Sequence, residues 1–271
     1  MKIGVFDSGL GGLFTLRAIV KKLPEYDYVY LGDTQRLPYG SRSPETIYQF
    51  LQEGIDFLLS KGCALVIVAC NTASAEALRK LQNEYLPKKY PNRKVLGVIV
   101  PMTEACDGYK NVGLVATEAT IASNAYPKEF KKRLKNIKIS GIATPLLVPI
   151  IEGGDFSNAK AVLTKYLSNF AKIKDGKKVW SIDALLLGCT HYGIIKKHFR
   201  ELLPKSIDII SQENVVPLKV RNYLMRHTEI EKVLTKNGRH YFYVTDLTSA
   251  FKTRANKWFG KKIVIKKITL V

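Results

Sequence analysis

Short, continuous apolar runs alternate along this chain with longer segments in which apolar residues recur every three or four positions. A continuous run is typical of a strand buried in a parallel sheet, and the longer period is typical of a helix that packs on it. The runs predict strands over residues 2–6, 28–31, 64–69, 95–100, 112–116, 137–143, 184–187 and 241–244, with helices over 13–23, 44–59, 72–86, 123–134, 156–170, 193–203 and 247–259. Strand and helix therefore alternate, which predicts an α/β fold with mainly parallel sheets.

The alternation pauses after the fourth predicted strand and then restarts, which predicts two doubly wound domains. No polar linker separates them, so we expect the domains to pack directly and to face each other across a cleft. Residues 66–74 and 185–193 also share one pattern: an apolar run, a small residue, a cysteine and then polar residues. This echo suggests that the two domains are pseudo-symmetric.

The cysteines inside this echo are the strongest candidates for chemistry. Ligands of parallel sheets bind at the carboxyl ends of strands, where Cys70 and Cys189 would both stand. Each precedes an expected helix start, whose partial positive charge lowers the pKa of a thiol. A lone buried cysteine is usually an inert apolar residue, but two in matching polar contexts favour a reactive pair. Cys63 and Cys106 lack such neighbours, and we expect them to be structural.

Two further features lie near expected strand ends. Residues 7–12 read Asp-Ser-Gly-Leu-Gly-Gly between a strand and a helix, where glycines let a ligand approach the backbone amides. This loop fits neither the Gly-Lys-Ser/Thr phosphate loop nor Gly-x-Gly-x-x-Gly, which disfavours a nucleotide. Asp7 could hold an ammonium group or help to activate a neighbour. His191, two residues after Cys189, could relay protons or hold a carboxylate.

Composition restricts the class of protein. The chain of 271 residues is 46% hydrophobic and 24% charged, which is typical of a globular protein. Its net charge of +20, from 43 Lys and Arg against 23 Asp and Glu, favours an anionic partner. The basic residues are dispersed, with the densest group over residues 252–267, which favours a solvated basic surface. A nucleic-acid-binding or topoisomerase-binding protein remains the alternative of another class.

The cysteine count and the apolar runs bear on cofactors and location. The four cysteines show no dense spacing and no Cys-x-x-Cys pair, so we predict neither a disulfide framework nor a structural zinc site. A metal held by Cys70, Cys189 and His191 is the weaker alternative, because no further ligand spacing accompanies them. The N-terminal residues lack the long apolar core of a signal peptide, and no apolar run reaches the length of a membrane span. We therefore expect a cytoplasmic protein with no membrane partner.

Several motifs together resemble the aspartate/glutamate racemase family, and within it the glutamate racemases. The carrying segments are residues 4–12, 32–33 with 38–40, 69–74 and 187–191, with weaker likeness over 117–126 and 149–152. The resemblance covers residue 1 to about 205 and returns in part over 242–260. The chain departs from the family over residues 209–213, which read Ile-Ile-Ser-Gln-Glu where relatives commonly carry Asp-Ser-Gly.

The resemblance implies a fold, a reaction and a biological role. It implies a first domain of residues 1–97 plus 208–271 and a second of residues 98–207. The implied reaction interconverts L- and D-glutamate without cofactor or metal, supplying D-glutamate for peptidoglycan. A racemase must remove a proton from one face of Cα and return one to the other, and one base on each face achieves this without turning the substrate. By resemblance, Cys70 would serve the D-enantiomer and Cys189 the L-enantiomer.

The resemblance also implies the supporting residues. Asp7 would assist Cys70, while Glu152 and His191 would assist Cys189. The residues expected to bind substrate are Asp7, Ser8, Tyr39, Gly40, Asn71, Thr72, Thr117, Thr120, Thr190 and His191. The expected partner is glutamate, with a homo-oligomer, first of all a dimer, as the expected assembly. A racemase for aspartate or another small amino acid is the alternative within the family.

Overall fold

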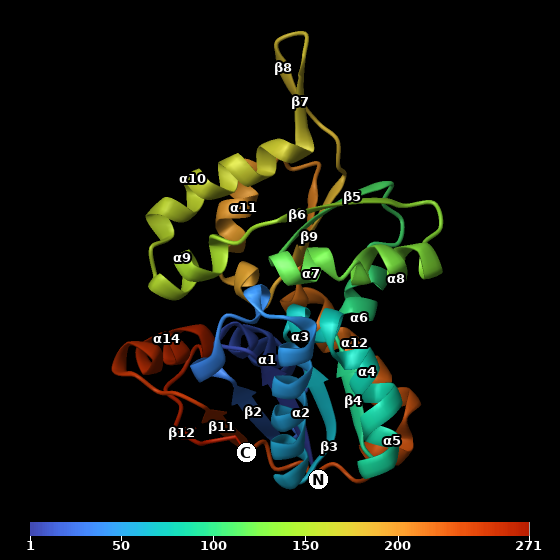
Figure 1. The fold of residues 1–271 in the computed structure, drawn as a ribbon, viewed down its shortest axis with the longest axis vertical. Helices are drawn as coiled ribbons and strands as arrows, with labels where there is room; N and C mark the ends of the chain where they lie inside the picture. The colour runs from blue at the N-terminus through green and yellow to red at the C-terminus, as the bar shows by residue number, and fades with distance from the viewer. Residues whose placement is uncertain (271) are drawn as a thin grey trace.

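The computed structural model describes residues 1–270 and consists of two stacked bodies, each built on its own parallel sheet (Figure 1). The first body contains a six-stranded sheet in the order β12-β11-β2-β1-β3-β4. All of its neighbouring strands are parallel. Its strands are β1 (Lys2–Asp7), β2 (Tyr28–Gly32), β3 (Cys63–Val68), β4 (Lys94–Gly97), β11 (His240–Val244) and β12 (Ile265–Lys267).

Helices cover both faces of this sheet. Along β1, Ile3 and Val5 point into one apolar cluster and Phe6 into another, because successive side chains of a strand face opposite sides. Helix α1 (Gly11–Lys22) packs in the first cluster, and α2 (Pro44–Ser60) packs in the second. The sheet is therefore doubly wound, as the sequence predicts.

The remaining helices of the first body follow β3 or belong to the end of the chain. They are α3 (Asn71–Glu76), α4 (Leu78–Lys80), a π-helical turn (Leu81–Tyr85), α5 (Leu86–Lys89), α12 (Gln212–Arg226), α13 (Thr228–Glu231) and α14 (Ser249–Phe259). Helices α12 and α14 both pack against α1. The end of the chain therefore returns to the body in which it began (Figure 1).

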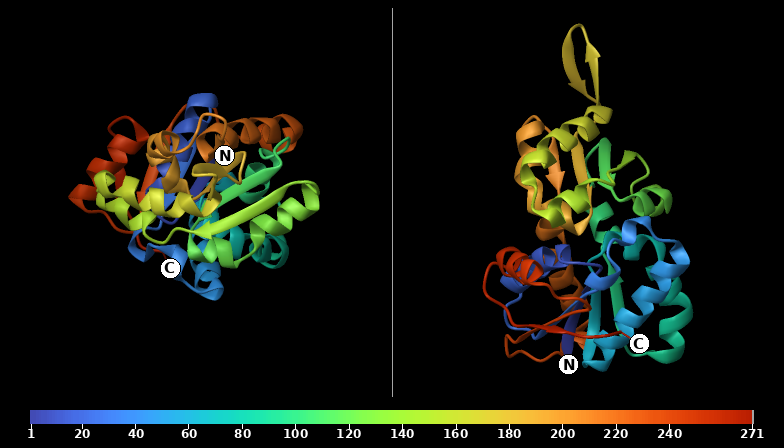
Figure 2. Two further views of the ribbon diagram at one scale, coloured as in Figure 1. Left: turned by 90° about the horizontal axis from the view of Figure 1, so that it is seen from above. Right: turned by 60° about the vertical axis from the view of Figure 1, so that its left-hand side comes forward.

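The second body contains a four-stranded parallel sheet in the order β10-β9-β5-β6. Its strands are β5 (Asn111–Ala116), β6 (Lys138–Ala143), β9 (Ala184–Gly188) and β10 (Asp208–Ile210), and its helices are α7 (Glu118–Ala122), α8 (Ala125–Arg133), α9 (Leu147–Gly153), α10 (Phe156–Leu167) and α11 (Lys196–Leu202). An antiparallel hairpin of β7 (Ala171–Lys174) and β8 (Lys177–Trp180) projects from this body (Figure 2).

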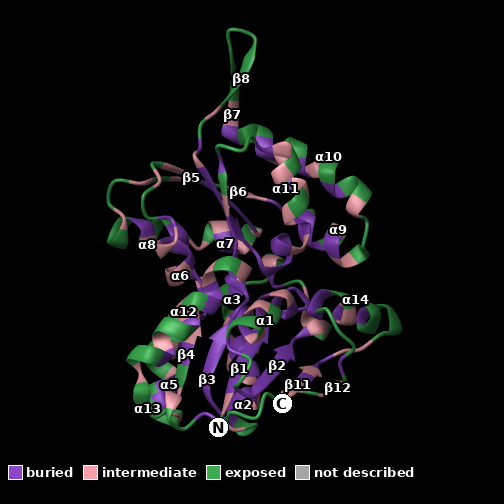
Figure 3. Cartoon of the chain, turned by 180° about the vertical axis from the view of Figure 1, so that it is seen from behind, coloured by how far each residue is buried: buried purple, intermediate pink, exposed green. Residues whose placement is uncertain are grey.

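The two bodies share one apolar core. A single cluster of buried residues includes Val5 and Leu16 of the first body together with Leu114 and Leu186 of the second. Figure 3 shows the buried strands at the centre of both bodies, whereas the hairpin is largely exposed. The predicted α/β architecture of two mainly parallel sheets is confirmed. Among residues 1–270, no helix combines the length and apolar character needed to cross a bilayer.

Several predicted boundaries are wrong. The strand expected over 95–100 ends at Gly97, and α6 (Ile99–Glu104) then carries the chain toward the second body. The helix expected over 72–86 is broken into several pieces. The last piece, α5, continues past the predicted end at residue 86 as far as Lys89. The helix expected over 123–134 is present as α8, but a separate short helix that was not predicted, α7, precedes it; α8 begins after Asn124, whose φ of 57° is left-handed.

One domain boundary also needs correction. Strand β10 pairs with β9, so residues 208–210 belong to the second sheet and not to the predicted first-domain segment 208–271. The chain returns to the first body only with α12, which packs on α1. Val271, the last residue of that predicted segment, lies outside the described residues.

Candidate active site

The carboxyl ends of β1, β3 and β9 bring together side chains from distant parts of the chain. Asp7 is the last residue of β1, Cys70 follows β3, and Cys189 follows β9 directly. Both cysteines line one small cavity of about 20 Å³. Of the other expected site residues, this cavity also contacts Ser8, Tyr39, Gly40, Asn71, Thr72, Thr117, Thr190 and His191.

Cys70 lies immediately before α3 and is buried. Its Sγ accepts a hydrogen bond from the Ala73 backbone N–H at 3.4 Å and donates to Ser8 Oγ at 3.5 Å. Burial and the nearby negative charge of Asp7 raise the pKa of the Cys70 thiol to about 12. The expectation of a lowered pKa for this thiol is therefore wrong, because burial and Asp7 outweigh the lowering by the Ala73 backbone N–H at the helix start.

Asp7 is fully buried beneath the glycine-rich loop. Its carboxylate accepts hydrogen bonds from the backbone N–H groups of Gly9 at 3.2 Å and Gly12 at 2.9 Å, and from the Thr190 hydroxyl at 3.3 Å. Burial raises the pKa of Asp7, and the positive charge of His191 and these hydrogen bonds offset only part of that shift. The Thr190 contact joins the first body to the second.

A close approach at Gly11 makes this junction between the bodies. A Cβ atom on Gly11 would lie 2.4 Å from Thr190 Oγ1 and 2.7 Å from His191 Nδ1. Any side chain at this position would therefore push α1 away from the residues that follow Cys189. Glycine is required here for steric reasons. Because Gly11 has no side chain, the start of α1 can lie against Thr190 and His191 of the other body.

Cys189 has a different environment from Cys70. His191 Nδ1 lies 3.8 Å from the Cys189 Sγ, and its Nε2 lies 2.5 Å from Glu152 Oε1. Burial alone would lower the pKa of His191, but its hydrogen bonds to Cys189 and Glu152 raise that pKa well above the usual range. His191 is therefore an imidazolium at neutral pH. One cysteine faces a carboxylate, and the other faces a cation.

Glu152 holds the far side of that imidazolium. It lies on α9 of the second body and is mostly buried. Burial would raise the pKa of Glu152, but the hydrogen bond and charge of His191, with a smaller contribution from the Arg254 guanidinium, hold it below the usual range. The pair therefore stays ionised at neutral pH.

Three hydroxyl groups gather across the junction of the two bodies. Thr72 Oγ1 of α3 lies 2.9 Å from Thr117 Oγ1, and Thr120 Oγ1 lies 2.9 Å from the same atom and 3.4 Å from Thr72. Thr117 also accepts the Thr120 backbone N–H at 3.3 Å, which begins α7. A cluster of hydroxyl donors suits a carboxylate ligand. Thr120 is fully buried behind the two residues that line the cavity.

Asn71, which lines this cavity, carries an unsatisfied donor. The Tyr126 hydroxyl donates to Asn71 Oδ1 at 2.7 Å, which orients the amide. Within the described residues the buried Asn71 Nδ2 has no hydrogen-bond partner. A buried amide without a partner costs free energy, so this group is suited to an anionic ligand. Sequence reasoning did not assign a role to Tyr126, although it lies in one of the weaker motifs.

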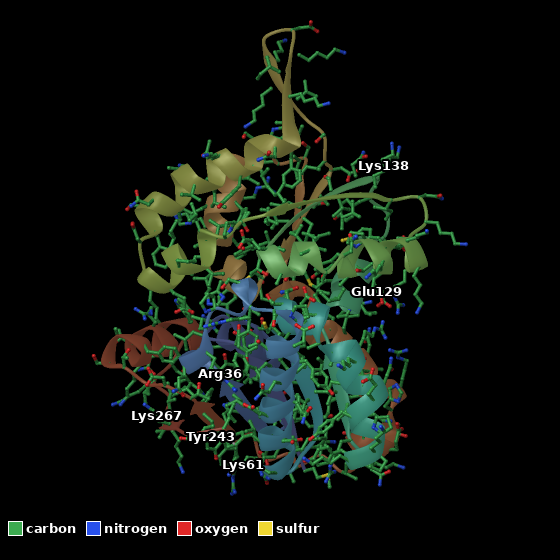
Figure 4. The ribbon with its side chains drawn as sticks, in the orientation of Figure 1. Arg36, Lys61, Glu129, Lys138, Tyr243 and Lys267 are labelled. Carbon is green, nitrogen blue, oxygen red and sulfur yellow. The ribbon has the colours of Figure 1, made fainter. Side chains whose placement is uncertain are left out.

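The loop that carries Tyr39 and Gly40 closes the cavity from the first body. The Tyr39 hydroxyl donates to the buried carboxylate of Asp33, which also accepts from Arg36 and from the Thr245 hydroxyl. Arg36 therefore lies within the first body and not in the cavity (Figure 4). Because its hydroxyl hydrogen is committed to Asp33, the Tyr39 side chain cannot donate that hydrogen to a ligand. The hydrogen bond by which Asp33 fixes this loop was not predicted from the sequence.

A larger cavity of about 560 Å³ contacts none of the expected site residues. Part of its charged rim is paired internally, with Arg79 2.6 Å from Glu129. Within residues 1–270 no group of three or more His, Cys, Asp or Glu side chains is arranged to hold a metal ion. The small cavity between the cysteines is therefore the candidate site.

Comparisons with known proteins agree with this arrangement. The family model described as Asp/Glu/Hydantoin racemase matches residues 8–212. The chain is 35% identical to a glutamate racemase of Ruegeria pomeroyi, over 97% of this chain and 98% of that protein. It is 36% identical to one of Geobacter metallireducens, over 96% and 93%.

Solved structures give the same result. Glutamate racemase isoform RacE1 from Bacillus anthracis superimposes with a TM-score of 0.87 at 31% identity, over 99% of this chain and 97% of that one. The glutamate racemase from Francisella tularensis in complex with D-glutamate gives 0.86 at 33% identity, over the same shares. The chain therefore belongs to the Asp/Glu/hydantoin racemase family, and it is an amino-acid racemase.

Proposed function

We propose that this racemase interconverts L- and D-glutamate, with Cys70 and Cys189 as the two bases and no cofactor. The relatives named above are glutamate racemases, and one of them is a complex with D-glutamate. The observation that carries the proposal is the placement of two thiols, one from each body, on a single cavity. A proton can be removed and replaced on opposite faces of Cα only if bases approach from two sides.

The charges around the thiols suggest their resting states. The Cys70 thiol is protonated because its pKa is about 12. The His191 imidazolium next to Cys189 can stabilise a negatively charged sulfur. In the L-to-D direction, the Cys189 thiolate takes the Cα proton and becomes a thiol. The Cys70 thiol then gives its proton to the other face of Cα and becomes a thiolate. The D-to-L direction reverses both transfers.

The polar groups of the cavity can hold the two carboxylates of glutamate. The free Asn71 Nδ2 and the hydroxyls of Thr72 and Thr117 are donors, as a small anion requires. Donors aimed at developing negative charge also stabilise the carbanionic transition state. A cavity of about 20 Å³ has room for about one water molecule. The cavity must therefore widen before it can hold glutamate.

The choice of glutamate over aspartate or another small amino acid rests on the relatives. Measuring circular dichroism over a panel of amino acids decides between them, and turnover of aspartate at the highest rate would contradict the proposal. A supply of D-glutamate for peptidoglycan, a cytoplasmic location and a dimeric assembly remain predictions of the resemblance.

Cysteine variants in deuterated water test the two-thiol mechanism. We expect Cys70→Ala and Cys189→Ala each to lower racemisation by at least about 10³-fold, because each removes a proton donor and acceptor. Proton NMR follows exchange at Cα, and circular dichroism follows inversion. One-way exchange of the Cα hydrogen can survive in either variant.

The matched control is Cys106→Ala, which removes a buried thiol that does not line the cavity. We expect it to retain racemase activity. Normal racemisation by either Cys70→Ala or Cys189→Ala would refute the mechanism.

A further inference from the structure

The C-terminal helix α14 reaches the catalytic residues of the other body, although no motif in the sequence assigns it a role there. It begins with the Thr248 side chain accepting the Phe251 backbone N–H at 3.2 Å and ends at Gly260, whose φ is 87°. The helix packs on α1 in the first body. Its buried face includes Trp258, with a relative exposure of 4%.

Trp258 contacts the imidazole of His191 edge-on. The two ring centroids are 6.0 Å apart and the ring planes are perpendicular, at 90°. This contact constrains the rotation of an imidazole whose two nitrogen atoms face different partners, Glu152 on one side and Cys189 on the other. A small rotation would lengthen one of these contacts, so the ring plane decides whether His191 can face both groups at once.

Arg254 lies one helical turn before Trp258, and residues four apart share a face of a helix. Its side chain is partly buried, and its Nε has no hydrogen-bond partner among the described residues. The Arg254 guanidinium is one of the positive charges that keep Glu152 ionised. Both side chains of α14 therefore act on the same Glu152–His191 pair, one through packing and one through charge.

We propose that Trp258 and Arg254 are positioning residues that align and charge the Glu152–His191 pair for proton transfer at Cys189. This inference rests on the proposed two-thiol mechanism. It makes the two faces of the reaction unequal: α14 supports the Cys189 side, whereas Cys70 depends on Ser8, Asp7 and α3. Disturbing α14 should therefore slow one of the two proton transfers selectively.

Isotope effects measure that selectivity. In Trp258→Ala we expect kcat to fall on the order of 10²-fold, as for a catalytic group misplaced by about 1 Å, with a smaller loss in Trp258→Phe. The primary isotope effect on kcat/KM should rise with L-glutamate deuterated at Cα and fall with deuterated D-glutamate, because removal of the L-proton at Cys189 becomes the slower transfer. A loss of folded enzyme alone would move neither isotope effect.

The pH profile tests Arg254. Glu152 has a lowered pKa, so its charge is present above that pKa and is lost as pH falls through it. Removing the cation in Arg254→Gln should raise that pKa and move the acid limb of kcat/KM to higher pH. Arg254→Lys, which keeps the positive charge, should return the acid limb of kcat/KM to its wild-type pH. Lys252→Gln, which removes a charge from the exposed side of the same helix, should leave it unchanged.

The outcomes separate the two proposals. An unmoved acid limb in Arg254→Gln, together with equal changes of both isotope effects in the Trp258 variants, would overturn the role of α14. Racemisation by Cys189→Ala would instead overturn the proposed function itself. Because Trp258→Phe keeps an aromatic edge, it provides a readout even if the alanine variant does not fold.

Discussion

At the scale of single residues, two cysteines with nearly the same local sequence have opposite surroundings. Cys70 is buried next to the Asp7 carboxylate, and Cys189 lies 3.8 Å from an imidazolium. The difference comes from residues far away in the chain, because Asp7 is supplied by β1 and the Glu152 partner of His191 by α9. The proposed two-thiol mechanism needs one thiol and one thiolate at rest, and this asymmetry favours that arrangement.

Alkylation rates report this asymmetry. We expect iodoacetamide at pH 7 to modify Cys189 before Cys70, because only the thiolate is a good nucleophile and the pKa of Cys70 is about 12. Peptide mass spectrometry after limited reaction gives both rates. Raising the pH should increase the rate at Cys70. Faster modification of Cys70 at pH 7 would contradict the assigned resting states.

At the scale of elements, the β7–β8 hairpin and helix α14 differ in what they contribute. Helix α14 buries Trp258 against the site, whereas the hairpin projects away from the second body (Figure 2). Ile173 in the hairpin is 73% exposed. Only its base, where Ala171 pairs with Trp180, packs on the core. Residues 172–179 of the hairpin are therefore independent of both the core and the site.

Shortening the hairpin tests that independence. Replacing residues 172–179 by an Asn-Gly turn keeps the Ala171–Trp180 pair and restores a two-residue hairpin loop. We expect kcat and KM to stay unchanged and the free energy of unfolding to change by about 0.5 kcal/mol or less, as for other exposed positions. Steady-state kinetics measures kcat and KM, and urea denaturation measures the free energy of unfolding. A large loss of stability would show that the hairpin has a structural role, and a large loss of activity would show that it has a catalytic one.

At the scale of the whole molecule, the net charge of +20 is spread over both bodies. Lys61, Lys138 and Lys267 lie on widely separated elements in Figure 4. In the predicted basic stretch over 252–267, Lys267 is paired with Asp246 at 2.7 Å. Dispersed charge favours a solvated basic surface over a dedicated nucleic-acid site.

Salt dependence distinguishes these two interpretations. We expect duplex DNA to bind weakly at low salt and to be released near physiological ionic strength, because dispersed lysines make few simultaneous phosphate contacts. Fluorescence anisotropy of a labelled duplex over a salt series measures this. Tight binding that persists at physiological salt would favour the alternative of a nucleic-acid-binding protein.

The sequence by itself determined the order of strands and helices, the parallel sheets and the segments that end in Cys70 and Cys189. These features are local, because apolar periodicity and the residue types at strand ends can be read over short windows. The same windows missed helix α7 and the breaks inside the helix expected over 72–86, where packing overrides propensity.

Only the tertiary structure decided which residues meet. It assigned β10 to the second sheet, committed the Tyr39 hydroxyl to Asp33, left Asn71 Nδ2 unpartnered and brought Trp258 to His191. It also raised the pKa of Cys70 where the sequence predicted a lowered one, because burial is a property of the surrounding fold and not of the neighbouring residues. Local pattern selected the two thiols, and long-range packing gave each one its charge environment.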